Sequence, residues 1–243
     1  MDGSLLTIAI FLLAAFAGAL IAGATGFAFG LVADALWLHI LTPIKTATLI
    51  IAFGLVVQGY AVSRMRRALD WRRLWPFILG AAFGVPAGVA VLGWADPASV
   101  RAGTGVFLIL YSAYALLRPA LAPMARGGAA ADAAVGFLNG VLGGVTGLAG
   151  ILVTIWCGLR GWPKDEQRAV FQPAALAIFA MSAAWLGAKG ALSGETVMLF
   201  LIGLPALAAG TWLGFRLYRR LDDAAFRKAV LILLLISGVA LVI

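Results

Sequence analysis

The sequence predicts an all-α, polytopic membrane protein made of two inverted repeats of about five helical segments each. Three observations lead to this prediction. Of the 243 residues, 63% are hydrophobic and 12% are charged, and the mean hydropathy is +1.05, a composition that a water-soluble domain cannot bury. Uncharged stretches long enough to cross a bilayer recur along the chain. A glycine-rich motif from the first half also recurs in the second half.

Eight uncharged stretches provide the predicted helices. Most contain close to the ~20 residues that cross a ~30 Å hydrocarbon core as an α-helix. They span residues 3–33, 46–63, 74–95, 102–117, 133–159, 169–188, 196–215 and 229–243. Two of them, 3–33 and 133–159, are too long for one helix and contain clustered glycines. We therefore expect each to form a hairpin of two helical arms joined at the glycines.

The basic residues predict the orientation. If each hairpin returns to its own side and every other stretch crosses once, one face receives all but three of the 18 Lys and Arg residues. The three exceptions are Lys45, Arg101 and Lys189. Because short cytoplasmic loops carry the excess of Lys and Arg, we expect this basic face in the cytoplasm and both termini outside, in an inner membrane. The chain does not start with a basic leader, so we expect the first apolar run to be retained as a helix.

The two halves of the chain resemble each other. Gly23-Ala24-Thr25-Gly26 recurs as Gly144-Val145-Thr146-Gly147, and the apolar arm after each motif ends at a proline. Four further pairs lie 126 positions apart: Gly84 and Gly210, Gly88 and Gly214, Val100 and Phe226, Arg101 and Arg227. Because each copy contains a hairpin and three crossings, the second copy begins on the opposite side and is inverted. We expect the first repeat in residues 1–118, a cytoplasmic linker at 119–131 and the second repeat in residues 132–243.

The two glycine motifs are the candidate solute site. A broken helix in a bilayer frees N–H and C=O groups that protein or a wet cavity must satisfy, and exposed helix N-termini offer donors and partial positive charge to an anion. The candidates are Gly23, Thr25, Gly26, Gly144, Thr146 and Gly147. Alternatively, the glycines only let helices pack closely, and the threonines only bond a carbonyl one turn back.

Two amides, Asn139 and Gln172, are the other uncharged polar candidates. Asn139 lies seven residues before Thr146, on a similar helix face, and serves either as a ligand or in a helix-to-helix hydrogen bond. Gln172 stands beside Pro173, which frees a backbone carbonyl, and is a candidate for a polar pore lining. We expect Gln58, near a helix end, to meet interfacial water.

Three charged residues complete the candidate set. Asp34 is a carboxylate among apolar residues, and an intramembrane acid is usually functional, so we consider it for proton coupling or for a pair with Lys45. Lys45 and Arg168 flank the two hairpins and are candidates for attracting an anion at opposite mouths. Arg168 is alternatively a cytoplasmic topology signal.

At these residues the sequence resembles the TauE/SafE family, also called the sulfite exporter family. The resemblance rests on the glycine-rich opening of each half and on the segment from Pro163 to Ala169. It implies transport of sulfite, sulfoacetate or other sulfur-containing anions, coupled to an ion gradient. Phe27, Ala28 and Phe29 depart from the richer glycine run expected in the first half. Their bulk predicts that the two halves contribute unequally to the site.

Other classes of function fit the sequence less well. An intramembrane enzyme needs a nucleophile with a base or a cluster of metal ligands, which one histidine and one distant cysteine do not supply. A membrane assembly protein would not need paired helix breaks, whereas an anion channel remains an alternative. We expect a small anionic solute and the lipid bilayer as partners, with proton or other ion coupling, no nucleic acid and no cofactor. The sequence does not fix the oligomeric state.

Overall fold

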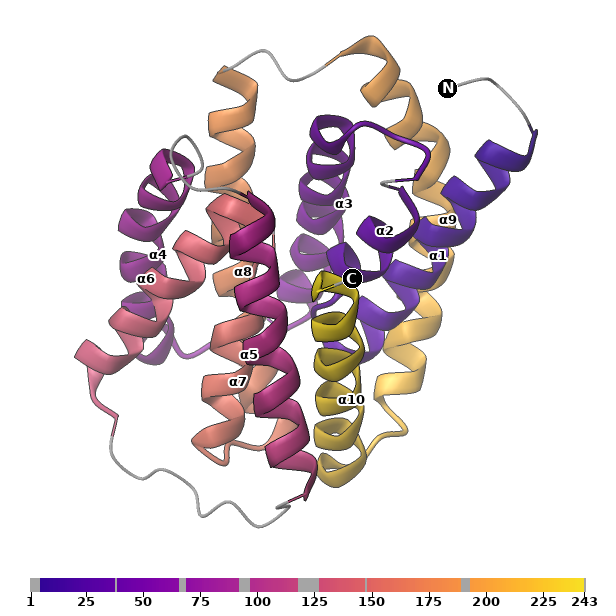
Figure 1. Ribbon diagram of the computed structural model, residues 1–243. Helices are drawn as coiled ribbons and strands as arrows, with labels where there is room; N and C mark the ends of the chain where they lie inside the picture. The colour runs from indigo at the N-terminus through magenta and orange to yellow at the C-terminus, as the bar shows by residue number, and fades with distance from the viewer. Residues whose placement is uncertain are drawn as a thin grey trace.

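The computed structural model describes residues 5–37, 39–65, 69–91, 97–117, 127–146, 148–188 and 193–242, which form ten α-helices and no strand (Figure 1). This confirms the predicted all-helical class. The first half contains α1 (Leu5–Thr25), α2 (Phe29–Trp37), α3 (Pro43–Arg64), α4 (Trp71–Val91) and α5 (Pro97–Leu117). The second contains α6 (Ala129–Thr146), α7 (Ile151–Leu159), α8 (Lys164–Ala188), α9 (Gly194–Tyr218) and α10 (Asp223–Val242). In each half a long helix is followed by a helix of nine residues and then by three long helices.

Several helices extend beyond the uncharged stretches that predict them. Within the described residues, three helical segments are long and apolar enough to cross a membrane by themselves: Leu5–Thr25, Lys45–Arg64 and Gly194–Tyr218. Helices α4, α8 and α10 instead begin with charged residues before their apolar part. Helix α6 begins at Ala129, inside the linker that the sequence predicts.

Ionic contacts between helix ends define two faces of the bundle. Lys45 at the start of α3 lies 2.5 Å from Glu195 at the start of α9. Arg73 at the start of α4 lies 2.6 Å from Glu166 at the start of α8. The α7–α8 and α9–α10 turns lie together at the lower end of Figure 1 and meet where Asp223 accepts the Lys164 N–H. These segments belong to the group that the sequence assigns to the basic face.

Glycines bring two pairs of helices into backbone contact. Helix α1 packs against α9, and α6 packs against α4. A Cβ atom on any of four glycines would collide with a carbonyl oxygen of the facing helix: Gly84 with Phe137, Gly88 with Val141, Gly210 with Phe16 and Gly214 with Leu20. The glycines that the sequence pairs at a spacing of 126 positions thus make matching helix contacts. Their partners Phe16 and Phe137, like Leu20 and Val141, lie 121 positions apart, the spacing of the two glycine motifs.

The close contact at Gly84 predicts intolerance to any side chain there. Gly84→Val should force α4 and α6 apart, and overpacking of this kind costs about 1–3 kcal/mol. Gly103→Val is the matched control, because a Cβ at Gly103 on α5 meets nothing within 4 Å. Thermal unfolding in detergent should show a lower Tm for Gly84→Val only. Equal stability of the two variants would contradict the contact.

Candidate functional site

The first helix break requires an unusual backbone at its glycine. Helix α1 ends at Thr25 and α2 begins at Phe29, and Gly26 between them has φ +89°. This left-handed conformation favours glycine. A Cβ atom on Gly26 would also lie 2.5 Å from the Phe171 ring. Both the backbone conformation and the available space therefore select glycine at this position.

Side chains from α3 and α8 satisfy the carbonyls that the first break exposes. The Arg168 guanidinium donates to Gly23 O at 3.0 Å. Gln58 Nε2 donates to Gly26 O at 2.9 Å, and Gln172 Nε2 donates to the same oxygen at 3.3 Å. The end of a helix leaves such carbonyls without an intrahelical partner, and in a bilayer they must be paired. These three side chains therefore hold the break in place.

Arg168 carries a positive charge into the interior of the bundle. Its side chain is 1% exposed, and within the described residues no carboxylate forms an ion pair with it. Its Nε lies 3.4 Å from Gln172 Oε1, and its Cζ lies 3.9 Å from the centre of the Tyr218 ring. One terminal nitrogen, NH1, has no partner in the described part of the chain. An intramembrane charge that is only partly satisfied makes Arg168 a candidate functional residue.

The second break is stabilised from within its own hairpin. Gly150, with φ +99°, precedes α7, and the fully buried Asn139 on α6 accepts the Leu152 N–H at 3.1 Å through Oδ1. Asn139 Nδ2 has no partner among the described residues. Asn139 thus provides the helix-to-helix hydrogen bond that was one of its two predicted roles, and its Nδ2 group keeps its N–H donors without a partner among the described residues.

The N-termini of the two short helices border one central cavity. Its lining includes Phe29, Gly30 and Leu31 at the start of α2 and Ile151 at the start of α7. The hydrogen-bond ladders of these helices begin at Val32 and Thr154, so the N–H groups of the residues before them have no backbone acceptor within their own helix, and of these the Leu152 N–H donates to Asn139 Oδ1. The cavity volume is about 20 Å³, enough for about one water molecule.

Gln58, like Arg168, lies deeper than the sequence predicts. It was expected at interfacial water, but it is 4% exposed and lines the central cavity. Its Oε1 has no partner in the described part of the chain. Its contact with Gly26 joins residues 32 positions apart, so no local pattern could indicate it. The available signal was a lone amide within an apolar helix.

Three of the remaining candidates already make structural contacts. Gly23 packs closely on α9, since a Cβ there would lie 2.8 Å from Thr211 O, and the Thr25 hydroxyl donates to Ile21 O at 2.8 Å, one turn back. Lys45 pairs with Glu195 at the face opposite the basic face.

The structure describes the other four candidates only in part or not at all. Gly144 is half-buried in the last turn of α6, which ends at Thr146. Asp34 lies in α2. The side chains of Thr146 and Asp34, and all of Gly147, lie outside the described residues.

The comparison with known families decides the identification. The sequence profile described as sulfite exporter TauE/SafE matches residues 10–241 of the 243. The chain belongs to the TauE/SafE family. Membership confirms the predicted resemblance and identifies a polytopic membrane transport protein of a family that exports sulfur-containing anions. Searches of curated proteins and of solved structures returned no match.

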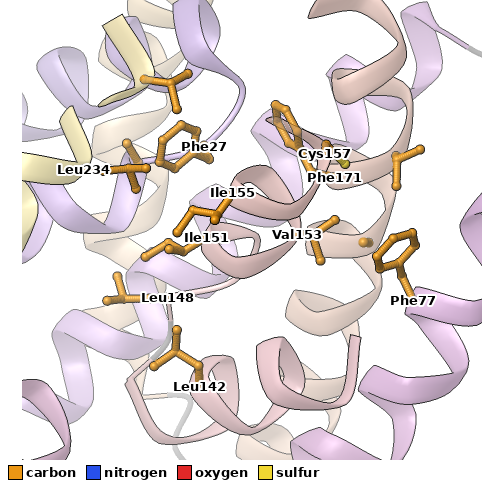
Figure 2. Packing of buried hydrophobic residues seen from close by; sticks show 14 of the residues in the cluster. Phe27, Phe77, Leu142, Leu148, Ile151, Val153, Ile155, Cys157, Phe171 and Leu234 are labelled. Carbon is orange, nitrogen blue, oxygen red and sulfur yellow. The ribbon is translucent and has the colours of Figure 1, made fainter. Parts of the chain in front are cut away.

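In this TauE/SafE protein an apolar cluster surrounds the second short helix. Figure 2 shows the α7 side chains Ile151, Val153, Ile155 and Cys157 within a cluster that also contains Phe27. Cys157 and Val153 are fully buried in this cluster, most of whose members come from outside α7. The cluster separates the central cavity from the end of α7 on the basic face.

The shared acceptor at Gly26 predicts coupling between Gln58 and Gln172. Either Gln58→Leu or Gln172→Leu leaves one donor on Gly26 O, and each should lower the free energy of unfolding by about 0.5–1.5 kcal/mol. The double variant leaves the carbonyl unpaired and should lose roughly 1 kcal/mol more than the sum. Denaturation of the wild type, the two single variants and the double variant in detergent measures this coupling energy. Additive losses would show that the two amides do not share the carbonyl.

Proposed function

We propose that this protein is a secondary carrier that moves a small sulfur-containing anion, such as sulfite, sulfoacetate or another organosulfonate, and that the central cavity is its binding site. The observation that carries the proposal is that α2 and α7 both direct their N-termini to this cavity. Helix N-termini bind oxyanions through free N–H groups and the helix dipole. No acidic side chain lines the cavity within the described residues. The site therefore suits a negative charge.

Amide and basic side chains extend this site. Gln58 lines the cavity directly, and Gln172 connects the same Gly26 carbonyl to Arg168. The Arg168 charge offsets the cost of bringing an anion into the bilayer interior. We keep Thr146 as a candidate donor from the second break. Because the Thr25 hydroxyl already donates to Ile21, we expect Thr25 to contribute less.

The volume of the central cavity implies a conformational change. About 20 Å³ accommodates one water molecule, whereas a sulfite ion carries three oxygens around its sulfur. The hairpins must therefore separate from α3 and α8 to admit the anion. Movement of one repeat against the other around a fixed midplane site is the usual means in transporters built from inverted repeats.

Matched contacts support an inverted repeat with a division near residues 119–131. The Trp37 indole on α2 donates to the Phe11 carbonyl on α1, and the Trp156 indole on α7 donates to Asp132 on α6. Phe11 and Asp132 lie 121 positions apart, the spacing of the glycine motifs. Each short helix is thus tied to its long partner at a corresponding level. The predicted orientation, with the basic face in the cytoplasm and both termini outside, follows from the charge distribution.

The transport reaction can be tested in proteoliposomes. When sulfite, thiosulfate, sulfoacetate, taurine and chloride are compared, the protein should take up a sulfur-containing anion selectively. Anion preloaded into the liposomes should accelerate exchange, as a carrier requires. Arg168→Gln should lower uptake at least tenfold, equivalent to about 1.4 kcal/mol. Arg216→Gln, which removes the same charge from an exposed residue in the last turn of α9, should transport like the wild type.

Two outcomes would contradict this account. Equal uptake by the two variants would remove Arg168 from the site. Flux without any acceleration by preloaded anion would indicate an anion channel instead.

Asp34 is our candidate for proton coupling. Asp34→Asn removes titration while it preserves shape, so anion exchange should stay near normal and the response to an imposed pH gradient should be lost. Glu195→Gln is the control, because Glu195 is an exposed acid paired with Lys45. Measurement of accumulation with and without the gradient distinguishes the two. Wild-type accumulation by Asp34→Asn would make Asp34 a structural residue.

A further inference from the structure

Gln58 brings an unpaired hydrogen-bond acceptor to the central cavity. Its side chain is 4% exposed and lines the cavity, and its Oε1 atom has no partner among the described residues. A buried polar atom without a partner costs free energy, so native proteins keep few of them, and each calls for an explanation. At a solute cavity, such an atom indicates a group that the solute must supply.

The first helix break fixes the orientation of this amide. Gln58 Nε2 donates to Gly26 O at 2.9 Å, and Gln172 Nε2 donates to the same oxygen at 3.3 Å. If the Gln58 amide were rotated by half a turn, Oε1 would face the Gly26 carbonyl, and two acceptors would oppose each other. The NH2 group of Gln58 is thus held by the protein, and Oε1 is the atom left for a ligand.

The rest of the cavity lining does not offer a side-chain donor to Gln58. Within the described residues, the other side chains of the lining belong to alanine, valine, leucine, isoleucine and phenylalanine, with two glycines. Phe27, Leu148 and Ile151 from this lining lie in one buried apolar cluster (Figure 2). The N-termini of α2 and α7 suit an oxyanion, whereas Gln58 suits a donor. The two polar features of the cavity therefore call for two different groups on one solute.

We propose that Gln58 is a specificity-determining residue that selects anions carrying their own hydrogen-bond donor, such as hydrogensulfite or a hydroxyalkanesulfonate. The sulfur oxyanion accepts from the N-termini of α2 and α7, and the hydroxyl group of the same solute donates to Gln58 Oε1. The inference rests on the proposed transport function and narrows its substrate class.

An anion without a donor fits this arrangement poorly. It either leaves Oε1 unpaired or brings a second acceptor toward it, and both cost free energy. A site that hydrogen-bonds a hydroxyl group rejects an analogue that lacks the group far more strongly than an apolar pocket rejects a change of one methylene. Sulfoacetate, whose two acid groups are both ionised near neutral pH, is therefore a weaker ligand than a hydroxyalkanesulfonate of similar size.

A matched pair of sulfonates tests this selectivity. Hydroxyethanesulfonate and propanesulfonate have the same charge and nearly the same size, but the first carries a hydroxyl group where the second carries a methyl group. In proteoliposomes, each competes with radiolabelled sulfite, or with radiolabelled sulfoacetate where sulfite is not transported. Hydroxyethanesulfonate should halve uptake at a concentration about tenfold lower, since tenfold is about 1.4 kcal/mol, within the cost of an unpaired buried acceptor.

Substitution of Gln58 should remove this preference. Gln58→Met keeps an unbranched side chain of similar length, but its thioether is only a weak acceptor, so the ratio should fall to about twofold or less. Gly26 O keeps its bond from Gln172, so the break stays paired. Gln58→Leu provides a second variant with the same expectation.

Thr46→Val is the matched control for these variants. Thr46 lies on α3 like Gln58, is fully buried, and has a side-chain oxygen without a partner in the described part of the chain. It does not line the central cavity, and valine has nearly the same shape as threonine. This variant should therefore keep the wild-type preference for hydroxyethanesulfonate.

The possible results separate this inference from the transport proposal. Equal inhibition of the wild type by the two sulfonates, or inhibition by neither, would overturn the role of Gln58, because Oε1 would then pair with water or protein instead of the solute. A preference that persists in both Gln58 variants would also overturn it. If either result occurs while the same liposomes transport an anion, the specificity proposal alone is wrong. If no anion of the panel is transported, the proposed function is wrong, and the specificity proposal fails with it.

Discussion

The central constraint on this structure is that backbone groups freed by a broken helix inside a bilayer must find partners in the protein. At the first break the partners come from distant elements. Arg168 and Gln172 on α8 and Gln58 on α3 bind the carbonyls of Gly23 and Gly26. This requirement places two amides and a guanidinium at the bundle centre. The same side chains that complete the fold thus surround the anion site that we propose.

The two breaks meet this constraint in different ways. Asn139 satisfies the second break from the preceding helix of the same hairpin, so α6 and α7 hold together. The first break depends on α8, and any movement of the α1–α2 hairpin away from α8 must release the Arg168 hydrogen bond to Gly23. Rearrangement of the first hairpin is therefore linked to the position of the buried charge. The asymmetry agrees with the bulkier first motif, in which Phe27 and Phe29 replace glycine-rich sequence.

The sequence was sufficient to predict the helices, the two breaks and the matching glycines. These features depend on hydropathy, on local backbone freedom and on spacings that a single chain displays. The partners of the breaks could not be predicted. Arg168 was expected at a mouth or as a topology signal but is buried, and Gln58 was expected at the interface but lines the cavity. Their contacts with Gly23 and Gly26 join residues 145 and 32 positions apart, so only the tertiary fold creates them.

Selenite, which has the geometry of sulfite, permits the most direct test that both helix breaks form one anion site. A structure determined with bound selenite would locate selenium by its anomalous scattering. The account predicts one peak between the N-termini of α2 and α7, within hydrogen-bonding distance of Gln58 and of backbone N–H groups from both helices. A peak confined to Lys45 and Glu195 at the opposite face, with none between the two breaks, would contradict it.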